Sequence, residues 1–564
     1  MHRKKQPFPI ATALRAGLKN YTAKTFRADL TAGLIVSLVA LPLSMALAIA
    51  VGLPPRHGLY TAIVAGFVCA ILGGSTSQVS GPTAAFVVIV APIVKAYGLH
   101  GIIWCEIMAG LMLVAMGAFR LGKLIHYVPY PVVTGFTAGI AVTIGTLALN
   151  DFLGLGITEL TGHFVDKAIT IIQSLPYMRG SELIVGMITL ITILYLPRLT
   201  TRIPSPAAGI ALGTLAAWLM SRYGFEVDTL NTRFSYIDDA GLSHHGIQPY
   251  PPKLHLPGSG DELFAIPSYD EFQVLFSSAM VVAALAALES LLSATVADSM
   301  ARTHHDPNAE LNGIGIANIF CGLAAGVPAT GAIARTAANI HAGCKTPVAA
   351  ASHSLFILLY VVTLAPYISY IPMAALAALL ITVAWRMSHF HQFVRIVRIA
   401  PRSDTVVLLC CFFLTVFIDM VAGVAVGMVM AALLFMKRIS DFTNLHVSTS
   451  EKPDITHGKL KPGTMIYRIE GPLFFGSINK TLEGADYIED DIKKLIVDLT
   501  HVPMIDVTGM LGMKTFLMSV IHDGREVYLC GERDVTGRIR RKIAGEPFAR
   551  HVHVMHTVHE ALKA

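Results

Sequence analysis

The stretch GVPATGAIARTAANIHAG, residues 326–343, carries one arginine among glycines and small apolar residues. Arg335 stands at an expected helix start within a long apolar part of the chain. A permanent charge in such a segment is costly and usually serves a function. An earlier stretch, SQVSGPTAAFVVIVAP at residues 77–92, is likewise an apolar run broken by Gly and Pro. Two broken hydrophobic segments at corresponding places in two halves of a chain indicate the binding site of a transporter.

Composition divides the chain into two kinds of sequence. Of its 564 residues 54% are hydrophobic and only 14% are charged, whereas globular proteins average about 25% charged residues. Residues 30–438 hold the long apolar runs, and residues 451–564 have the composition of a soluble domain, with a linker at 439–450. The chain contains no phosphate-binding loop of the G-x-x-x-x-G-K-[ST] type and no metal-ligand spacing. We therefore predict a membrane protein that is no enzyme, with no metal site, no cofactor and no nucleic-acid partner.

The apolar runs predict about fourteen membrane spans, since a span needs roughly 20 apolar residues unless it is broken. The N-terminal segment 1–29 is basic, with no acidic residue before Asp29, so the positive-inside rule makes it cytoplasmic. An even number of spans then puts both termini in the cytoplasm. The expected spans lie near 30–52, 58–74, 83–97, 101–119, 130–150, 181–197, 205–221, 272–297, 312–325, 332–343, 347–367, 371–386, 405–418 and 420–437.

A long polar segment separates these spans into two sets of seven. Residues 222–269 carry more acidic than basic side chains and many Pro and Gly, as suits a loop outside the cytoplasm. An odd number of spans in each half gives the halves, about 30–221 and 270–438, opposite orientations. We therefore predict an inverted repeat.

The soluble domain alternates strand-like and helix-like segments, which predicts a compact α/β unit of about 110 residues. A strand pair is expected over 464–477, and further strands over 493–500, 526–531 and 551–556. Helices are expected over 506–524 and 534–545. Thr508 is placed to cap the first of these helices.

The two broken segments together carry the chemistry of an anion site. If Gly81-Pro82-Thr83 and Gly331–Arg335 both begin half-helices that point at one spot, their free backbone N–H groups form an anion cradle. Thr83 would add a hydroxyl donor, and Arg335 could hold oxygen atoms bidentately. The alternative is that the Gly and Pro residues only kink helices and that Arg335 reaches the membrane surface.

Glu289 is the candidate for coupling transport to a cation. It is the one ionisable residue in a long apolar run, and a carboxyl group there can carry a proton or bind Na⁺. The alternative is a structural carboxylate that bonds backbone groups or pairs with Arg335. Glu106 also falls in an apolar run, but we expect it near the outer end of its span, in contact with water.

Five stretches resemble the SulP family of anion transporters, which end in a STAS domain. They are LPLSMALAIAVGLPPRHGLY (41–60), SGPTAAFVVIV (80–90), ALESLLSATVADSM (287–300), GAIARTAAN (331–339) and DLTHVPMIDVTG (498–509). The resemblance covers nearly the whole chain. It implies fourteen spans in a seven-plus-seven inverted repeat, a core domain that moves against a gate domain as an elevator, homodimers, and a cytoplasmic STAS domain.

The resemblance also implies a substrate site between the third and tenth spans. Glu289 matches the acidic position that serves cation coupling in some members, and Thr508 lies near a position that is phosphorylated in STAS relatives. A metabolic partner such as acyl carrier protein is a further family-level expectation for the STAS domain. The family's substrate positions correspond here to Thr83, Ala84 and Phe86, to Ala332, Ile333, Ala334, Arg335 and Thr336, and to Leu43 and Leu47, where many relatives have Gln and an aromatic residue.

Within the family, the same motifs are similar to bacterial transporters of C4-dicarboxylates. The sequence thus predicts import of succinate, fumarate or aspartate by proton symport, in the lipid of a bacterial inner membrane. The alternative is uptake of bicarbonate or sulfate, with Na⁺ as the other candidate coupling ion, or uncoupled anion conductance.

Overall fold

The structure is a computed structural model in which the chain forms two compact units, Met1–Met428 and Val429–Ala564. It describes residues 8–123, 128–157, 160, 162–200, 203–238, 241–255, 264–418, 420–449, 460–479, 488, 491–521 and 525–564. The start of the expected STAS domain, residues 451–459, therefore lies outside the described residues.

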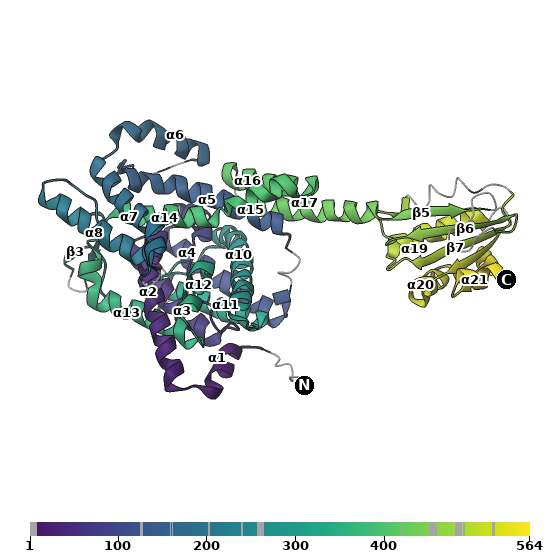
Figure 1. The fold of residues 1–564 in the computed structure, drawn as a ribbon, viewed down its shortest axis with the longest axis horizontal. Coiled ribbons are helices and arrows are strands. Elements are labelled where there is room, and N and C mark those ends of the chain that lie inside the picture. The colour runs from purple at the N-terminus through teal and green to yellow at the C-terminus, as the bar shows by residue number, and fades with distance from the viewer. Residues whose placement is uncertain are drawn as a thin grey trace. The chain divides into compact units, whose positions relative to one another are not determined.

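The first unit is helical (Figure 1). Its helices are α1 (Thr12–Gly17), α2 (Ala23–Ala50), α3 (Pro55–Leu72), α4 (Val87–Ala118), α5 (Tyr130–Leu153), α6 (Phe164–Ser174), α7 (Gly180–Leu199), α8 (Ser205–Arg222), α9 (Leu230–Arg233), α10 (Tyr269–Ala301), α11 (Pro307–Leu323), α12 (Ile333–His341), α13 (Val348–Ile368), α14 (Met373–Met387), α15 (Phe390–Ile399), α16 (Arg402–Phe417) and α17 (Met420–Asp441), which runs on into the second unit. Short 3₁₀ turns are η1 (Leu18–Asn20), η2 (Ala84–Phe86) and η4 (Leu175–Tyr177), and the strands are β1 (Ser80–Pro82), β2 (Ser235–Ile237), β3 (Ser243–His245) and β4 (Ala329–Gly331).

Every expected span overlaps one of these helices. The spans expected at 83–97 and 101–119 share α4, which has a non-helical residue at Gly98 (φ 60°). Within the described part of the chain, nine helices are long and apolar enough to cross a membrane by length and composition. The mostly helical membrane fold is thus confirmed, and the count of fourteen spans stays a prediction.

The helices of the first unit pack as two bundles. One bundle consists of α2, α3, α4, α10, α11, α12 and α13, and the other is built mainly from α5, α7, α8, α14 and α16. Each half of the chain contributes its early spans to the first bundle and its later spans to the second, as the expected core and gate domains require. Glycine allows close approach where α4 crosses α11, because a Cβ on Gly110 would meet the carbonyl oxygen of Gly315 at 2.6 Å.

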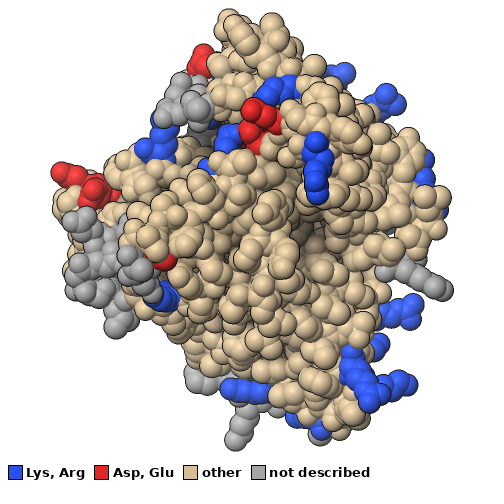
Figure 2. Space-filling view, turned by 90° about the vertical axis from the view of Figure 1, so that its left-hand side faces the viewer, with Lys and Arg blue, Asp and Glu red and all other residues tan. Residues whose placement is uncertain are grey.

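The surface of the molecule reflects the low charge of its sequence. Figure 2 shows one face on which side chains other than Lys, Arg, Asp and Glu cover wide areas, with the charged groups in a few places and toward the rim. Exposed large apolar residues such as Leu111, Leu355 and Phe413 are typical of helices that face lipid.

The second unit is a five-stranded sheet covered by helices on both faces. Its elements are β5 (Asn444–Ser448), β6 (Thr464–Glu470), β7 (Lys494–His501), α19 (Val507–Ile521), β8 (Glu526–Cys530), α20 (Arg533–Ile543), η7 (Pro547–His551), β9 (Val552–Met555) and α21 (Val558–Lys563). The strand order is β5-β6-β7-β8-β9, with β5 antiparallel to β6 and the others parallel. Alternate strand residues face α19 and α20 on one side, as Tyr467 does against Phe516, and α21 on the other.

Three details of this unit differ from the sequence-based expectations. Only 464–470 of the expected strand pair is a strand, and its antiparallel partner is β5, which lies within the expected linker 439–450. The expected strand at 551–556 is shorter, because η7 runs to His551. Thr508 does not cap α19, since Asp506 accepts the backbone N–H of Gly509 at 2.7 Å and Thr508 is exposed in the first turn.

Asp498 on β7 anchors this unit electrostatically. Its carboxylate accepts from Nε of Arg468 at 2.8 Å and from the backbone N–H and hydroxyl of Thr500 at 3.0 and 2.5 Å. Burial alone would raise the pKa of Asp498, but the hydrogen bonds from Thr500 and Arg468 outweigh it and hold the pKa below its ordinary value. The ionised form therefore stabilises the fold.

We expect Asp498→Asn to lower the free energy of unfolding of a 442–564 fragment by about 2 kcal/mol at pH 7, since hydrogen bonds to a charged group contribute about 1.5–3 kcal/mol. Because the folded-state pKa is depressed, the difference from wild type should be full above the unfolded-state pKa of about 3.9 and shrink as pH falls below it. Urea unfolding followed by circular dichroism measures this. Asp534→Asn is the control, because the exposed Asp534–Arg538 pair should contribute only about 0.3–0.5 kcal/mol; equal losses in both variants would contradict the prediction.

Candidate anion-binding site

The two broken segments meet in the structure. β1 and β4 pair antiparallel, with Ser80 opposite Gly331, Gly81 opposite Thr330 and Pro82 opposite Ala329. The backbone N–H of Ala332 extends the pairing to the carbonyl of Val79 at 3.0 Å. Non-helical backbone within a membrane unit is tolerated only where the protein buries it or where it lines a cavity. This pairing, called the crossing below, brings the starts of η2–α4 and of α12 together.

Small polar side chains of neighbouring helices hold the crossing in place. Ser290 of α10 accepts the backbone N–H of Gly331 at 2.9 Å, and Thr330 donates to the carbonyl of Ala286 at 3.0 Å. Asn318 of α11 bonds both the N–H and the carbonyl of Ala329 at 2.9 Å. These contacts satisfy backbone groups that a helix would otherwise pair, which is why an apolar bundle contains them.

Arg335 lies at the centre of this arrangement. Its side chain is 1% exposed and is among the largest fully buried side chains of the described residues. Nη2 donates to the carbonyl oxygen of Pro82, so the arginine of α12 reaches across to β1. Nε and Nη1 are buried with no hydrogen-bond partner among the described residues. The alternative that Arg335 extends to the membrane surface is therefore wrong.

Both helix starts at the crossing lack a side-chain cap. Thr83 precedes η2 and Ala332 precedes α12, and neither accepts a capping hydrogen bond. By contrast, Ser268 caps α10 and Asp306 caps α11. Uncapped first turns leave backbone N–H groups free to bind an anion and carry the positive end of the helix dipole.

Thr83 contacts Glu289 directly. The hydroxyl of Thr83 donates to Oε2 of Glu289 at 3.0 Å, and both side chains are partly exposed. This bond connects the start of η2 with α10. No salt bridge joins Glu289 and Arg335 in the described part of the chain. The structure therefore contradicts the alternative in which these two residues form an ion pair.

The other predicted site residues fall into two groups. Ile333 and Ala334 are exposed in the first turn of α12, and Ala332, which precedes that helix, is partly exposed. The buried group consists of Leu43, Leu47, Ala84, Phe86 and Thr336. Thr336 accepts the backbone N–H of Val79 at 3.1 Å, so its hydroxyl supports the crossing.

One carboxylate that supports the crossing was missed by the sequence analysis. Glu310 of α11 is 1% exposed and accepts the backbone N–H groups of Gly74 and Ser75 at 2.8 and 3.0 Å. It also accepts from Nε2 of Gln78 at 2.7 Å. It thus fixes the turn that leads from α3 into β1. The available signal was an acidic residue four places after Asp306, the cap of α11.

The expectation for Glu106 was wrong. Its side chain is 0% exposed, and it lies against α11, where a Cβ on Gly322 would meet its Cβ at 3.3 Å. The helix α4 continues on both sides of it, so the residue is inside the bundle and not at a wet end.

We expect Gly81→Ala to disable the crossing, because a Cβ there would collide with Nη1 of Arg335. The guanidinium would have to move, so anion uptake into proteoliposomes should fall at least about tenfold, as misplacement of a binding group by 1 Å can cost 10²-fold. Gly180→Ala is the matched control, since a Cβ at Gly180 meets nothing within 4 Å. Similar uptake by Gly81→Ala and Gly180→Ala would contradict the role of the crossing.

Broken helices that pair inside a two-bundle membrane unit are typical of a membrane carrier, and in this chain an α/β sheet domain follows that unit. The sulfate permease family matches residues 26–411, and the STAS domain matches residues 458–561. The chain belongs to the sulfate permease family, and its second unit contains a STAS domain.

Two relatives indicate the range of this family. The chain is 38% identical over 493 residues to the "Putative sulfate transporter YvdB" of Bacillus subtilis (strain 168), covering 87% of this chain and 88% of that protein. It is 27% identical over 542 residues to the bicarbonate transporter BicA of Picosynechococcus sp., covering 92% of this chain and 90% of BicA. These relatives are transporters.

Two solved structures share the fold. The overall structure of SLC26A9 superposes with a TM-score of 0.81 at 18% identity, over 98% of this chain and 92% of that one. The transmembrane domain of a cyanobacterial bicarbonate transporter BicA matches with a TM-score of 0.59 at 25% identity, over 73% of this chain and 98% of that domain. The similarity to SLC26A9 concerns the fold alone.

Proposed function

We propose that this chain transports a small inorganic oxyanion, with sulfate as the first candidate and bicarbonate as the second. The observation that carries the proposal is the guanidinium of Arg335, which is buried at the crossing with Nε and Nη1 unpartnered among the described residues. Two uncapped helix starts add backbone donors beside it. An oxyanion offers several acceptor oxygens to such a set of donors.

The names of the relatives support this choice over a C4-dicarboxylate. The two relatives reported above are a sulfate and a bicarbonate transporter by name. The sequence motifs predicted succinate, fumarate or aspartate first, with bicarbonate or sulfate as the alternative, so the test must include C4-dicarboxylates as well.

The hydrogen bond between Thr83 and Glu289 supports cation coupling. While Glu289 is ionised, the Thr83 hydroxyl donates to it. A proton on Glu289 would remove that acceptor charge and release the hydroxyl to donate to an anion at the helix start. Proton uptake and anion binding would then favour each other, as symport requires. Na⁺ bound by the carboxylate would act in the same sense.

The test is uptake of radiolabelled sulfate by proteoliposomes that contain the full chain. We expect saturable uptake that excess unlabelled sulfate and bicarbonate inhibit more strongly than succinate. Inward gradients of H⁺ and of Na⁺, imposed separately, identify the coupling ion. Uptake of labelled succinate that sulfate does not inhibit would reject the proposal in favour of a dicarboxylate carrier. Sulfate currents of single-channel size would instead indicate uncoupled conductance.

The remaining expectations belong to the same proposal. They are a homodimer in a bacterial inner membrane with both termini in the cytoplasm, a STAS domain regulated at the exposed Thr508 or by a partner such as acyl carrier protein, and elevator motion of one bundle against the other. The separation of the helices into two bundles supports the elevator motion.

A further inference from the structure

Helix α15 (Phe390–Ile399) connects the membrane helices α14 and α16 and buries none of its residues. The backbone of His389 is left-handed (φ 43°), so α14 ends before it and α15 begins as a separate helix. It contacts α5 and α16 (Figure 1). Since α14 is the twelfth of the expected spans, we expect this connection at the cytoplasmic surface of the membrane.

The side chains of α15 divide into an apolar face and a basic face at 3.6 residues per turn. The apolar face consists of Phe390, Phe393, Val394, Ile396 and Val397, and the basic face consists of His391, Gln392, Arg395 and Arg398. The last residue, Ile399, lies outside this division. A short helix with two such faces, connected to membrane helices at both ends, is typical of one that lies in the plane of the membrane surface.

The apolar face of α15 continues into the lipid-facing surface of its neighbours. Phe390 stacks on Trp385 of α14 with ring centroids 5.8 Å apart, and Phe393 packs against Phe412 of α16 at 5.4 Å. Trp385 is 61% exposed, and Phe390 and Phe413 are each 50% exposed. Exposed aromatic rings at the end of a span are typical of the boundary between acyl chains and headgroups. The apolar face of α15 therefore extends a surface that already meets lipid.

The basic face belongs to a longer run of positive charge. Residues 386–402 contain four arginines and no acidic residue. All four are exposed, namely Arg386, Arg395, Arg398 and Arg402. Each Lys or Arg near a membrane surface adds to the attraction for anionic lipids. This run therefore favours anionic headgroups over neutral ones.

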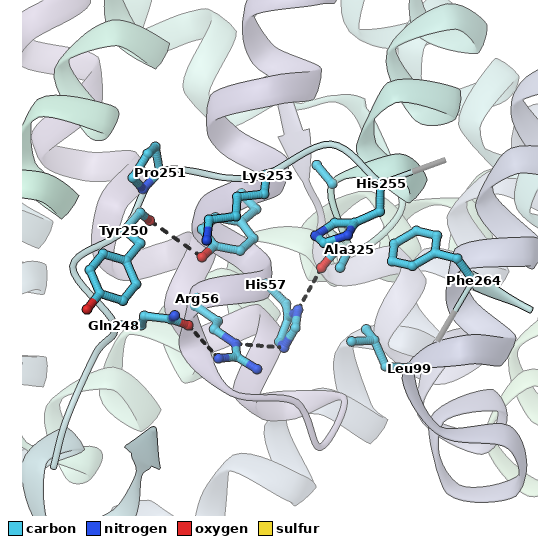
Figure 3. A pocket seen from close by; sticks show the side chains of 12 residues that line it. Arg56, His57, Leu99, Gln248, Tyr250, Pro251, Lys253, His255, Phe264 and Ala325 are labelled. Carbon is cyan, nitrogen blue, oxygen red and sulfur yellow. Dashed lines mark hydrogen bonds between the residues drawn. The ribbon is translucent and has the colours of Figure 1, made fainter. Parts of the chain in front are cut away.

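The protein does not engage the guanidinium groups of Arg395 and Arg398. Neither side chain forms a hydrogen bond or an ion pair within the described ranges. Arg56 shows the contrast (Figure 3), because its Nη1 donates to Oε1 of Gln248 at 2.6 Å and its Nε donates to Nε2 of His57 at 3.3 Å. The two guanidinium groups of α15 thus keep their N–H donors for a ligand.

We propose that α15 lies among the lipid headgroups of the leaflet in which α14 ends, and that Arg395 and Arg398 bind the phosphate of an anionic phospholipid. The apolar face then lies about 5–10 Å deep, at the boundary between headgroups and acyl chains. Arginine side chains at that depth extend their charged ends to the headgroups, where the guanidinium fork fits phosphate oxygens. The bound lipid holds α15, and with it the attached helices of the second bundle, at the membrane surface. This lipid site is independent of which anion the chain transports.

The first test uses Trp385 as a reporter, because its ring stacks on the first residue of α15. Trp104→Phe and Trp218→Phe leave Trp385 as the remaining one of three tryptophans. The full-length protein is placed in bilayers of equimolar phosphatidylglycerol and phosphatidylcholine, with brominated acyl chains on one lipid or on the other. We expect brominated phosphatidylglycerol to quench Trp385 emission more strongly. Arg395→Gln and Arg398→Gln should each lower the binding constant of phosphatidylglycerol relative to phosphatidylcholine by up to about fivefold.

Arg222→Gln is the matched control, because it removes the same charge near the other end of α14. Arg222 is the exposed last residue of α8, and Gly213 of that helix packs against Ala375 near the start of α14. Equal quenching by the two brominated lipids, or a preference that survives both glutamine substitutions in α15, would overturn the proposal. Tryptophan emission that neither lipid quenches would overturn it too, since protein rather than lipid would then cover α15.

A second test needs no change of tryptophan. The full-length protein in detergent is titrated with phosphatidylglycerol or phosphatidylcholine, and its melting temperature is followed. A lipid that binds the folded state raises this temperature, so phosphatidylglycerol should raise it further than phosphatidylcholine does. Arg395→Gln with Arg398→Gln should lose the difference, whereas Arg395→Lys with Arg398→Lys should keep most of it, because lysine keeps the charge. Added salt should weaken the difference by screening exposed charges. A difference that neither the glutamine substitutions nor salt reduces would contradict the lipid site.

Discussion

Replacing Arg335 by glutamine is expected to reduce sulfate uptake into proteoliposomes about 100-fold or more while the protein still folds. The guanidinium is the one buried cation at the crossing among the described residues, and it donates to Pro82 from α12. Removing one partner of a buried charge interaction costs about 2–5 kcal/mol, and each 1.4 kcal/mol is tenfold in affinity. The loss should appear in initial rates at sulfate concentrations well below saturation.

Arg335→Lys separates charge from geometry. Lysine keeps the positive charge but is a compact ammonium without the planar fork, so its uptake should lie between that of glutamine and that of the wild type. Melting temperatures in detergent show whether either variant has lost its fold. If Arg335→Gln transports sulfate within about twofold of wild type, the proposed role of Arg335 is rejected; the ~2-fold limit corresponds to less than about 0.5 kcal/mol.

The meeting of the two broken segments could be predicted from sequence because membrane burial restricts the backbone so strongly. Gly81-Pro82 and Gly331 interrupt apolar runs, and a backbone that leaves the helix inside a membrane must find partners in the protein. An inverted repeat supplies such a partner, because each interruption has its counterpart in the other half. What the sequence could not indicate is that the two would pair as strands, with Gly81 opposite Thr330.

The supporting carboxylate Glu310 could not be predicted from the same patterns. Its acceptor role depends on Gly74, Ser75 and Gln78, which lie more than 200 positions earlier in the chain. No local periodicity encodes such a pairing. Glu106 was misjudged for a related reason, because an acidic residue near the estimated end of an apolar run reads as solvated unless the neighbouring helix is known.

In the second unit, the alternation of strands and helices predicted the positions of β6, β7, β8 and β9, and the edge strand β5 was missed. Strand β5 precedes the residue at which the domain was expected to begin. It pairs with β6, and residues 450–459, which connect the two strands, lie outside the described part of the chain. A five-residue strand with half-exposed side chains has little apolar pattern of its own. Its place is determined by the free edge of β6 and not by its own sequence.

Glu289→Gln is expected to abolish gradient-driven accumulation while leaving the anion site able to bind. Glutamine carries no charge and cannot gain or lose a proton, so it mimics the protonated state of Glu289, in which the Thr83 hydroxyl is released to donate to the anion. One pH unit corresponds to about 1.36 kcal/mol, or tenfold in concentration, for each coupled proton. For each coupled proton, an inward gradient of one pH unit should therefore raise sulfate accumulation by wild-type proteoliposomes about tenfold. Accumulation by Glu289→Gln should not respond to the gradient.

Exchange of internal for external sulfate without a gradient is the readout that separates coupling from binding. We expect it to persist in Glu289→Gln and to weaken in Thr83→Val, which loses the hydroxyl that donates to Glu289 and that we propose as a donor to the anion. Asp270→Asn is the matched control, because Asp270 is an exposed carboxylate in the first turn of the same helix α10. Accumulation by Glu289→Gln equal to that of Asp270→Asn under the same proton gradient would exclude Glu289 as the proton carrier. The same comparison under a Na⁺ gradient then decides whether this carboxylate couples Na⁺ instead.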